Sequence, residues 1–184
     1  MKRVLICAVQ VPFERGGAEA LVEGLRRQLA ARDYCVDAVS LPFKWYPPAR
    51  LMASCLLWRT LDLTEANGQP IDLVVATKFP SYLVRHPHKV TWLVHQYRQA
   101  YDWYGSPLSD LTPSPQDTRV RQAIFQMDRR TLGESRKLFA ISRNVAARLL
   151  RYNGLTAETL YPPTVHEGRL YCDEYGDTIV YVGR

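Results

Sequence analysis

The sequence lacks the groupings of cysteine and histidine that crosslink small proteins or bind structural metals. Its 184 residues include four cysteines and four histidines. The cysteines stand far apart with no Cys-x-x-Cys pair, and three of them fall within apolar segments, as is typical of reduced thiols in a cytoplasmic protein. His86-Pro87-His88 has no cysteine or carboxylate at the spacing that would complete a metal site. We therefore expect no metal site at these histidines.

Long apolar runs are also missing. No stretch approaches the roughly 18 apolar residues that a membrane span requires. Lys2-Arg3 and the apolar residues that follow look like the start of a secretory signal, but Gln10 and Pro12 interrupt the run and no small-residue cleavage site follows. We therefore interpret the segment from Val4 to Val9 as a buried first strand, and we expect a cytoplasmic protein.

Excess acidity is absent, and the positive charge is concentrated in one region. The formal net charge is +6. Between Arg119 and Arg151 there are nine lysines and arginines against two acids, Asp128 and Glu134, which gives +7 and leaves −1 for the rest of the chain. A regional patch suits an anionic ligand or an anionic membrane surface. The alternative is a solvated helix face.

Apolar runs alternate with amphipathic segments along the chain. This order predicts an α/β fold with a parallel sheet that helices cover on both faces. Near-continuous apolar runs predict strands at residues 4–9, 36–40, 72–77, 90–94, 137–141 and 157–161. Apolar residues at helical spacing predict helices at residues 18–32, 49–63, 119–135 and 143–152, and residues 105–118 have the composition of an exposed loop.

Ligands of open parallel sheets bind beyond the carboxyl ends of the strands, so the residues at those ends are the candidates for a site. Gly16 and Gly17 follow the first strand, Lys78 follows the third, and His95 and Gln96 follow the fourth. Ser142 and Asn144 follow the fifth strand. After His95, polar groups alternate with aromatic rings in a segment that includes Arg98 and Tyr101, a pattern that suits the hydroxyls and apolar faces of carbohydrate.

The glycine pair permits close approach of a ligand and aims helix amides at an anion such as phosphate, although a tight strand-to-helix turn would need the same residues. A dinucleotide fingerprint is disfavoured. The G-x-G-x-x-G spacing is missing, and no acidic residue ends the second strand at Ser40-Leu41. The helix at residues 49–63, preceded by aromatic residues, either packs on the sheet or docks on a membrane or a lipid acceptor.

Taken together, these motifs resemble the amino-terminal half of a family 4 retaining glycosyltransferase, a bacterial enzyme of the GT-B type with two Rossmann-like domains. The matching segments, in chain order, are Gly16-Gly17-Ala18-Glu19, His95, Phe139-Ala140-Ile141-Ser142 with Asn144 and Leu149, Tyr161-Pro162-Pro163, and Val182-Gly183-Arg184. The resemblance covers nearly the whole chain.

The resemblance implies transfer of a sugar from a nucleotide-sugar donor to an acceptor, with retention at the anomeric carbon and without a metal or other cofactor. It implies that residues 1–165 form the acceptor-side domain and that residues 166–184 form a linker and the first strand of a missing donor-binding domain. We therefore expect the 184 residues alone to be inactive.

By the same resemblance, His95 would hydrogen-bond the transferred sugar, and Gly16 and Gly17 would approach the donor phosphate or the acceptor. Ser142 and Asn144 would shape the floor of the cleft, and Arg184 would stabilise the leaving diphosphate. The acids Glu14 and Glu19 depart from expectation near a phosphate site.

Two other function classes stay open at this point. One is a nucleotide-binding oxidoreductase, which the missing fingerprint weakens. The other is a non-catalytic module that binds nucleic acid through the basic region. For the transferase, the expected partners are a nucleotide sugar and a saccharide, lipid-linked or small-molecule acceptor, with peripheral contact at the inner face of the membrane and without nucleic acid.

Overall fold

The computed structural model describes residues 1–163, 169 and 171–181. The strands of its main sheet are β1 (Arg3–Gln10), β2 (Cys35–Pro42), β5 (Leu73–Ala76), β6 (Lys89–Leu93), β7 (Lys137–Ala140) and β8 (Glu158–Thr159). The α-helices are α1 (Gly17–Ala30), α2 (Pro48–Thr60), α3 (Pro115–Gly133) and α4 (Arg143–Asn153). Short elements complete the fold: the hairpin strands β3 (Glu65–Ala66) and β4 (Gln69–Pro70), and the 3-10 turns η1 (Ser81–Leu83) and η2 (Arg98–Ala100).

The main sheet has six strands in the order β2-β1-β5-β6-β7-β8, and every neighbouring pair is parallel. The predicted α/β class, with a Rossmann-like parallel sheet flanked by helices, is confirmed. The chain moves outward from β1 to β2 and then returns to add β5 on the other side of β1. This reversal between β1 and β5 is where open α/β sheets form a ligand-binding crevice.

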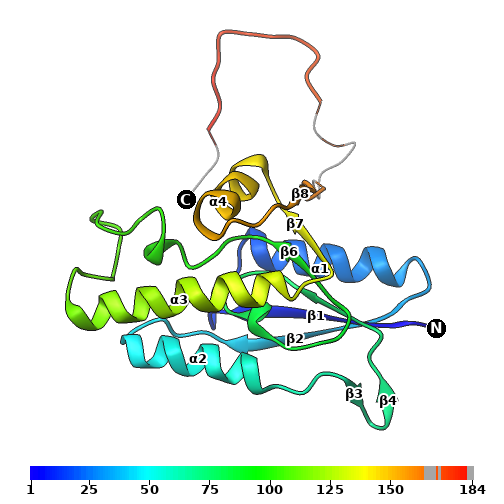
Figure 1. The fold of residues 1–184 in the computed structure, drawn as a ribbon. Coiled ribbons are helices and arrows are strands. Elements are labelled where there is room, and N and C mark those ends of the chain that lie inside the picture. The colour runs from blue at the N-terminus through cyan, green and yellow to red at the C-terminus, as the bar shows by residue number, and fades with distance from the viewer. Residues whose placement is uncertain (164–168, 170, 182–184) are drawn as a thin grey trace.

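The two faces of the sheet are covered unequally (Figure 1). On one face, side chains of α2, α3 and α4 form the larger core with Cys7, Val74 and Leu93 of the strands. On the other face, α1 packs against Val4 and Val75 through its apolar stripe. No side chain of α1 is fully buried. The α1 face is therefore the more open one.

The largest difference from a predicted boundary is at the start of α3. Helix α3 begins at Pro115, four positions before the predicted start, because the Ser114 hydroxyl accepts a hydrogen bond from the Asp117 amide and caps the helix. The exposed loop is correspondingly shorter, and Leu111 within it is buried.

The segment after β8 bears on the expected second domain. Residues 178–181 form no helix or strand among the described residues. Val182, Gly183 and Arg184, which would complete the expected strand, lie outside the described residues. The assignment of residues 166–184 to a linker and a further strand stays a prediction.

Candidate functional site

The carboxyl ends of β5 and β6 lie side by side and hold two of the predicted site residues. The Val94 amide donates to the Thr77 carbonyl over 3.1 Å, and the Phe79 amide donates to the His95 carbonyl over 3.2 Å. These bonds extend the parallel pairing of the two strands by one step. They place Lys78 and His95 on adjacent segments at the same edge of the sheet.

A carboxylate links this edge to the start of α1. The Gly16 amide donates to Glu19 Oε2 over 2.8 Å, and Lys78 Nζ lies 3.2 Å from Glu19 Oε1. Burial alone would raise the pKa of Glu19, but the hydrogen bond from Gly16 and the Lys78 charge hold it below its ordinary value. Glu19 is therefore ionised at neutral pH. A phosphate could reach the Gly16 amide only by displacing this carboxylate.

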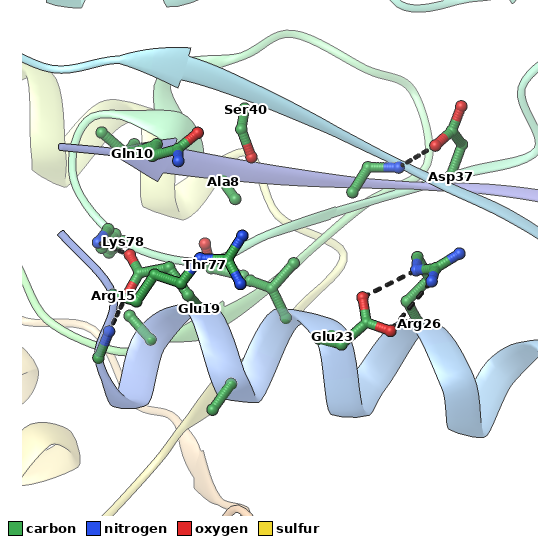
Figure 2. A pocket seen from close by; sticks show the side chains of 16 residues that line it. Ala8, Gln10, Arg15, Glu19, Glu23, Arg26, Asp37, Ser40, Thr77 and Lys78 are labelled. Atoms are coloured by element: carbon green, nitrogen blue, oxygen red, sulfur yellow. Dashed lines mark hydrogen bonds and ion pairs between the residues drawn. The ribbon is translucent and has the colours of Figure 1, made fainter. Parts of the chain in front are cut away.

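A cavity of about 620 Å³ opens between α1 and the strands β1 and β2 (Figure 2). Its polar lining includes Gln10, Arg15, Glu19, Asp37, Ser40 and Lys78. Because both signs of charge and uncharged hydrogen-bonding groups share the wall, the cavity suits a neutral molecule with several hydroxyls better than a strong ion. It is also the reason why Ala18 and Val22 of the predicted apolar stripe stay partly exposed.

His95 is held as a neutral imidazole with one defined tautomer. Its Nδ1 lies 2.7 Å from the Gln96 carbonyl oxygen, which only accepts, so Nδ1 carries the proton. Burial lowers the pKa of His95 below its ordinary value; the Gln96 carbonyl opposes this shift, whereas the charges of Lys78, Arg148 and Arg98 add to it. At neutral pH, Nε2 is therefore a hydrogen-bond acceptor, suited to a hydroxyl group.

Gln96 and Tyr101, which the sequence placed among the ligand contacts, are buried in a network of internal hydrogen bonds. Gln96 donates to Asn153 Oδ1 over 2.6 Å and accepts from Arg148 Nε over 3.1 Å. The Tyr101 hydroxyl donates to Asp128 Oδ2 and accepts from Asn153. These contacts make both side chains supports for the edge of the sheet.

The other predicted residues divide between the edge and the helix that follows it. Arg98 is partly exposed, binds Asp102 through two nitrogens, and lies 4.0 Å from the centre of the Trp103 ring. Ser142 caps α4, because its hydroxyl accepts from the Val145 amide. Asn144 is exposed in the first turn of that helix. The predicted contact at Arg184 lies outside the described residues.

Sequence reasoning missed Arg148 and Asp128, the two charged residues that the helices bury at this site. Arg148 lies three positions after Val145 and directly before Leu149, and Asp128 lies midway between Ile124 and Leu132. Both occur within apolar stripes at helical spacing. A charged residue within an apolar stripe is the sequence feature that could have identified both residues, because a buried charge requires a partner.

Comparison with known proteins does not assign the chain: no family model matches it, and no curated protein matches it. In the described part of the chain, no three His, Cys, Asp or Glu side chains gather as metal ligands would. Among the same residues, no helix has the length and apolar character needed to cross a bilayer. The functional proposal therefore rests on the chemistry of the carboxyl edge.

Proposed function

We propose that this chain forms the acceptor-side domain of a retaining glycosyltransferase that uses a nucleotide sugar. In that reaction the acceptor hydroxyl loses its proton and bonds to the anomeric carbon, while the bond from that carbon to the donor's diphosphate breaks. The nucleoside diphosphate leaves, and the proton is released with it. Three of the motifs that carry the resemblance, those at Gly16, His95 and Ser142, follow the carboxyl ends of β1, β6 and β7.

The single observation that carries the proposal is the state of His95. A neutral imidazole with its proton on Nδ1 offers Nε2 as an acceptor at the end of β6. Such a group can accept a hydrogen bond from a sugar hydroxyl and strengthen it as charge develops in the transition state. The cavity beside α1, with its mixed polar lining, reaches this edge of the sheet at Gly16 and Lys78 and supports a polyhydroxylated ligand there.

An oxidoreductase that binds a dinucleotide fits less well. Glu19 occupies the Gly16 amide at the start of the helix, so neither the pyrophosphate of a dinucleotide nor a donor phosphate reaches that amide without displacing the carboxylate. Strand β2 ends at Leu41 and Pro42, which offer no carboxylate to a ribose. Nucleic-acid binding is also disfavoured, because Arg121 stacks on Tyr104 and Arg148 is buried, so part of the basic region serves the fold.

The test is turnover by the protein that carries this domain, measured as release of nucleoside diphosphate from a panel of nucleotide sugars. We expect His95→Ala to lower kcat by about 10²-fold, the range for one preorganised polar contact, with a smaller change in donor affinity. His88→Ala is the matched control, because His88 is exposed just before the amino end of β6.

Unchanged turnover of the His95→Ala variant, with its circular dichroism intact, would remove His95 from the mechanism. A wild-type protein that turns over no nucleotide sugar would refute the proposed function itself.

A further inference from the structure

The cationic side chains around His95 outnumber the carboxylates that pair with them. Asp102 Oδ2 accepts from Arg98 Nη2 at 2.7 Å and from Arg98 Nε at 3.0 Å, and Arg148 Nη1 reaches the same oxygen at 3.4 Å. Two guanidinium groups thus share one carboxylate. Lys78, the third cation that acts on His95, already has its own partner in Glu19. Arg98, Arg148 and Asp102 together therefore carry one net positive charge.

Burial makes this excess costly. Arg148 is only 9% exposed, and its best hydrogen bond goes to the neutral amide oxygen of Gln96. Burial and repulsion by Arg98 both lower the pKa of Arg148, while Asp102 opposes the shift. A buried guanidinium normally requires a full counter-charge at short distance.

Neighbouring side chains hold the Arg98 and Arg148 guanidinium groups in position and leave some of their N–H donors without a hydrogen bond in the described part of the chain. Gln96, which holds Arg148 Nε, is itself held by Asn153, and the Trp103 ring lies against the Arg98 guanidinium. Among the described residues, Nη2 of Arg148 and Nη1 of Arg98 take part in no hydrogen bond. Both belong to groups that meet at one oxygen of Asp102, so the spare donors lie on neighbouring side chains.

We propose that Arg98 and Arg148 together bind an oxyanion, a phosphate or carboxylate carried by the acceptor, beside His95. Planar guanidinium groups match the geometry of such anions, and the added negative charge would balance the shared pair. The assignment of the anion to the acceptor rests on the proposed function. The anion site itself does not.

The test is a titration of the isotopically labelled 184-residue chain with inorganic phosphate, followed by nuclear magnetic resonance of the arginine Nε–H groups. Ionic strength is held constant with sodium chloride. We expect saturable shifts at Arg98 and Arg148, together with a rise in the pKa of His95 when phosphate is bound. Arg148→Gln should weaken the apparent affinity for phosphate about tenfold or more, as expected for loss of a charge-assisted bond.

Arg151→Gln is the matched control, because Arg151 is exposed on the same helix. Arg98→Gln provides a second test at a less buried position and should also weaken phosphate binding, even where Arg148→Gln fails to fold. Equal phosphate affinity in Arg98→Gln, Arg151→Gln and the wild type would overturn the proposal. So would the absence of saturation in the wild type.

Two further ligands identify the source of the anion. We expect glycerol 3-phosphate, a monoester on a hydroxylated carrier, to compete with phosphate for the wild-type site. If uridine diphosphate competes with phosphate and glycerol 3-phosphate does not, the assignment of the anion to the acceptor is overturned. None of these measurements requires sugar transfer, so phosphate binding without turnover would refute only the proposed function, and turnover without phosphate binding would refute only this inference.

Discussion

Lys89, the first residue of β6, has a charged end that lies in the core beneath α3. Its side chain is 1% exposed, and Nζ donates to the carbonyls of Tyr82, Val84 and Thr131 over 2.7 to 3.1 Å. Burial lowers the pKa of Lys89 to about 8, although the nearby Glu134 carboxylate opposes the shift. One side chain thus satisfies three carbonyls contributed by η1, the residue that follows it and α3.

Replacement of Lys89 tests this role. Lys89→Met leaves those carbonyls without their donor, and we expect the free energy of unfolding to fall by about 3 kcal/mol. Lys137→Met is the control, because Lys137 begins the next strand but pairs with Glu158 at the surface, where a salt bridge contributes about 1 kcal/mol or less. Urea denaturation followed by circular dichroism measures both. Equal losses in the two variants would contradict the structural role of Lys89.

Asp128 makes the stability of the protein depend on pH. Burial raises the pKa of Asp128 to about 7, although the hydrogen bond from Tyr101 opposes this shift. An aspartate in the unfolded chain titrates near about 4, so the folded protein binds this proton more tightly. The favourable contribution of the neutral acid is complete below about pH 4 and is lost as the pH rises through about 7.

Asp128→Asn removes this dependence while it keeps an oxygen acceptor for Tyr101. The stability of the variant relative to wild type should therefore increase by up to about 1.4 kcal/mol per pH unit between pH 5 and pH 7. Urea titrations of both proteins at pH 5, 6 and 7 measure this difference, in which the other titrating groups cancel. A difference that stays constant with pH would show that Asp128 keeps an ordinary pKa.

The position of a residue at the end of a strand predicts its place in the candidate site better than the chemical type of its side chain does. The ends of β5 and β6 are visible as the ends of apolar runs, so Lys78 and His95 could be placed at the carboxyl edge from the sequence. Gln96 directly follows His95 but is fully buried, because it meets Asn153 and Arg148 from a distant helix. Such partners are set by packing, which sequence spacing alone does not give.

At the scale of elements, the predicted strands and helices of residues 1–163 are all present. Two features differ from the prediction, an additional short hairpin and an earlier start of α3, and each has a local cause. The β3-β4 hairpin turns at Asn67 and Gly68, both with positive φ, and its flanking strands of two residues each are too short to show an alternating pattern in the sequence. The early start of α3 depends on the Ser114 cap, which lies within a stretch of loop-like composition.

The end of α2 carries exposed leucines, and arginines lie beside them at the ends of α2 and α3. Helix α2 buries Leu51, Cys55 and Trp58, yet Leu56 on its outer side is 64% exposed. Arg59 near the end of α2 pairs with Glu134, which also pairs with Arg130 of α3, so the two helix ends lie together. Exposed apolar side chains beside arginines suit an anionic membrane, which is the peripheral contact that the sequence analysis predicts and that stays a prediction.

Charge reversal tests that contact. Arg129→Glu combined with Arg130→Glu should reduce sedimentation with vesicles that contain anionic lipid, by an amount that shrinks as salt rises. Reversal of Arg143 and Arg151, which are exposed on α4, changes the net charge equally and serves as the control. If both double variants and the wild type sediment alike at low salt, the basic end of α3 is a solvated helix face.

At the scale of the whole molecule, the sheet divides the fold into a tightly packed side and an open side. Helix α3 buries Ile124, Thr131 and Leu132 completely or nearly so, whereas no side chain of α1 is buried and the cavity separates part of α1 from β1 and β2. A region with few buried apolar contacts opens at a lower free energy than the core. The candidate site therefore adjoins the less stable half of the molecule.

Hydrogen exchange of the backbone amides tests this asymmetry. Amides in the middle of α1 should exchange faster than those in the middle of α3, because local opening of α1 exposes less apolar surface. A hydroxylated ligand that enters the cavity contacts α1 together with β1 and β2, so its binding should slow exchange in α1 and leave α3 nearly unchanged. Equal protection of α1 and α3 without ligand would contradict the asymmetry. Slowed exchange confined to α3 would place the ligand on the opposite face of the sheet.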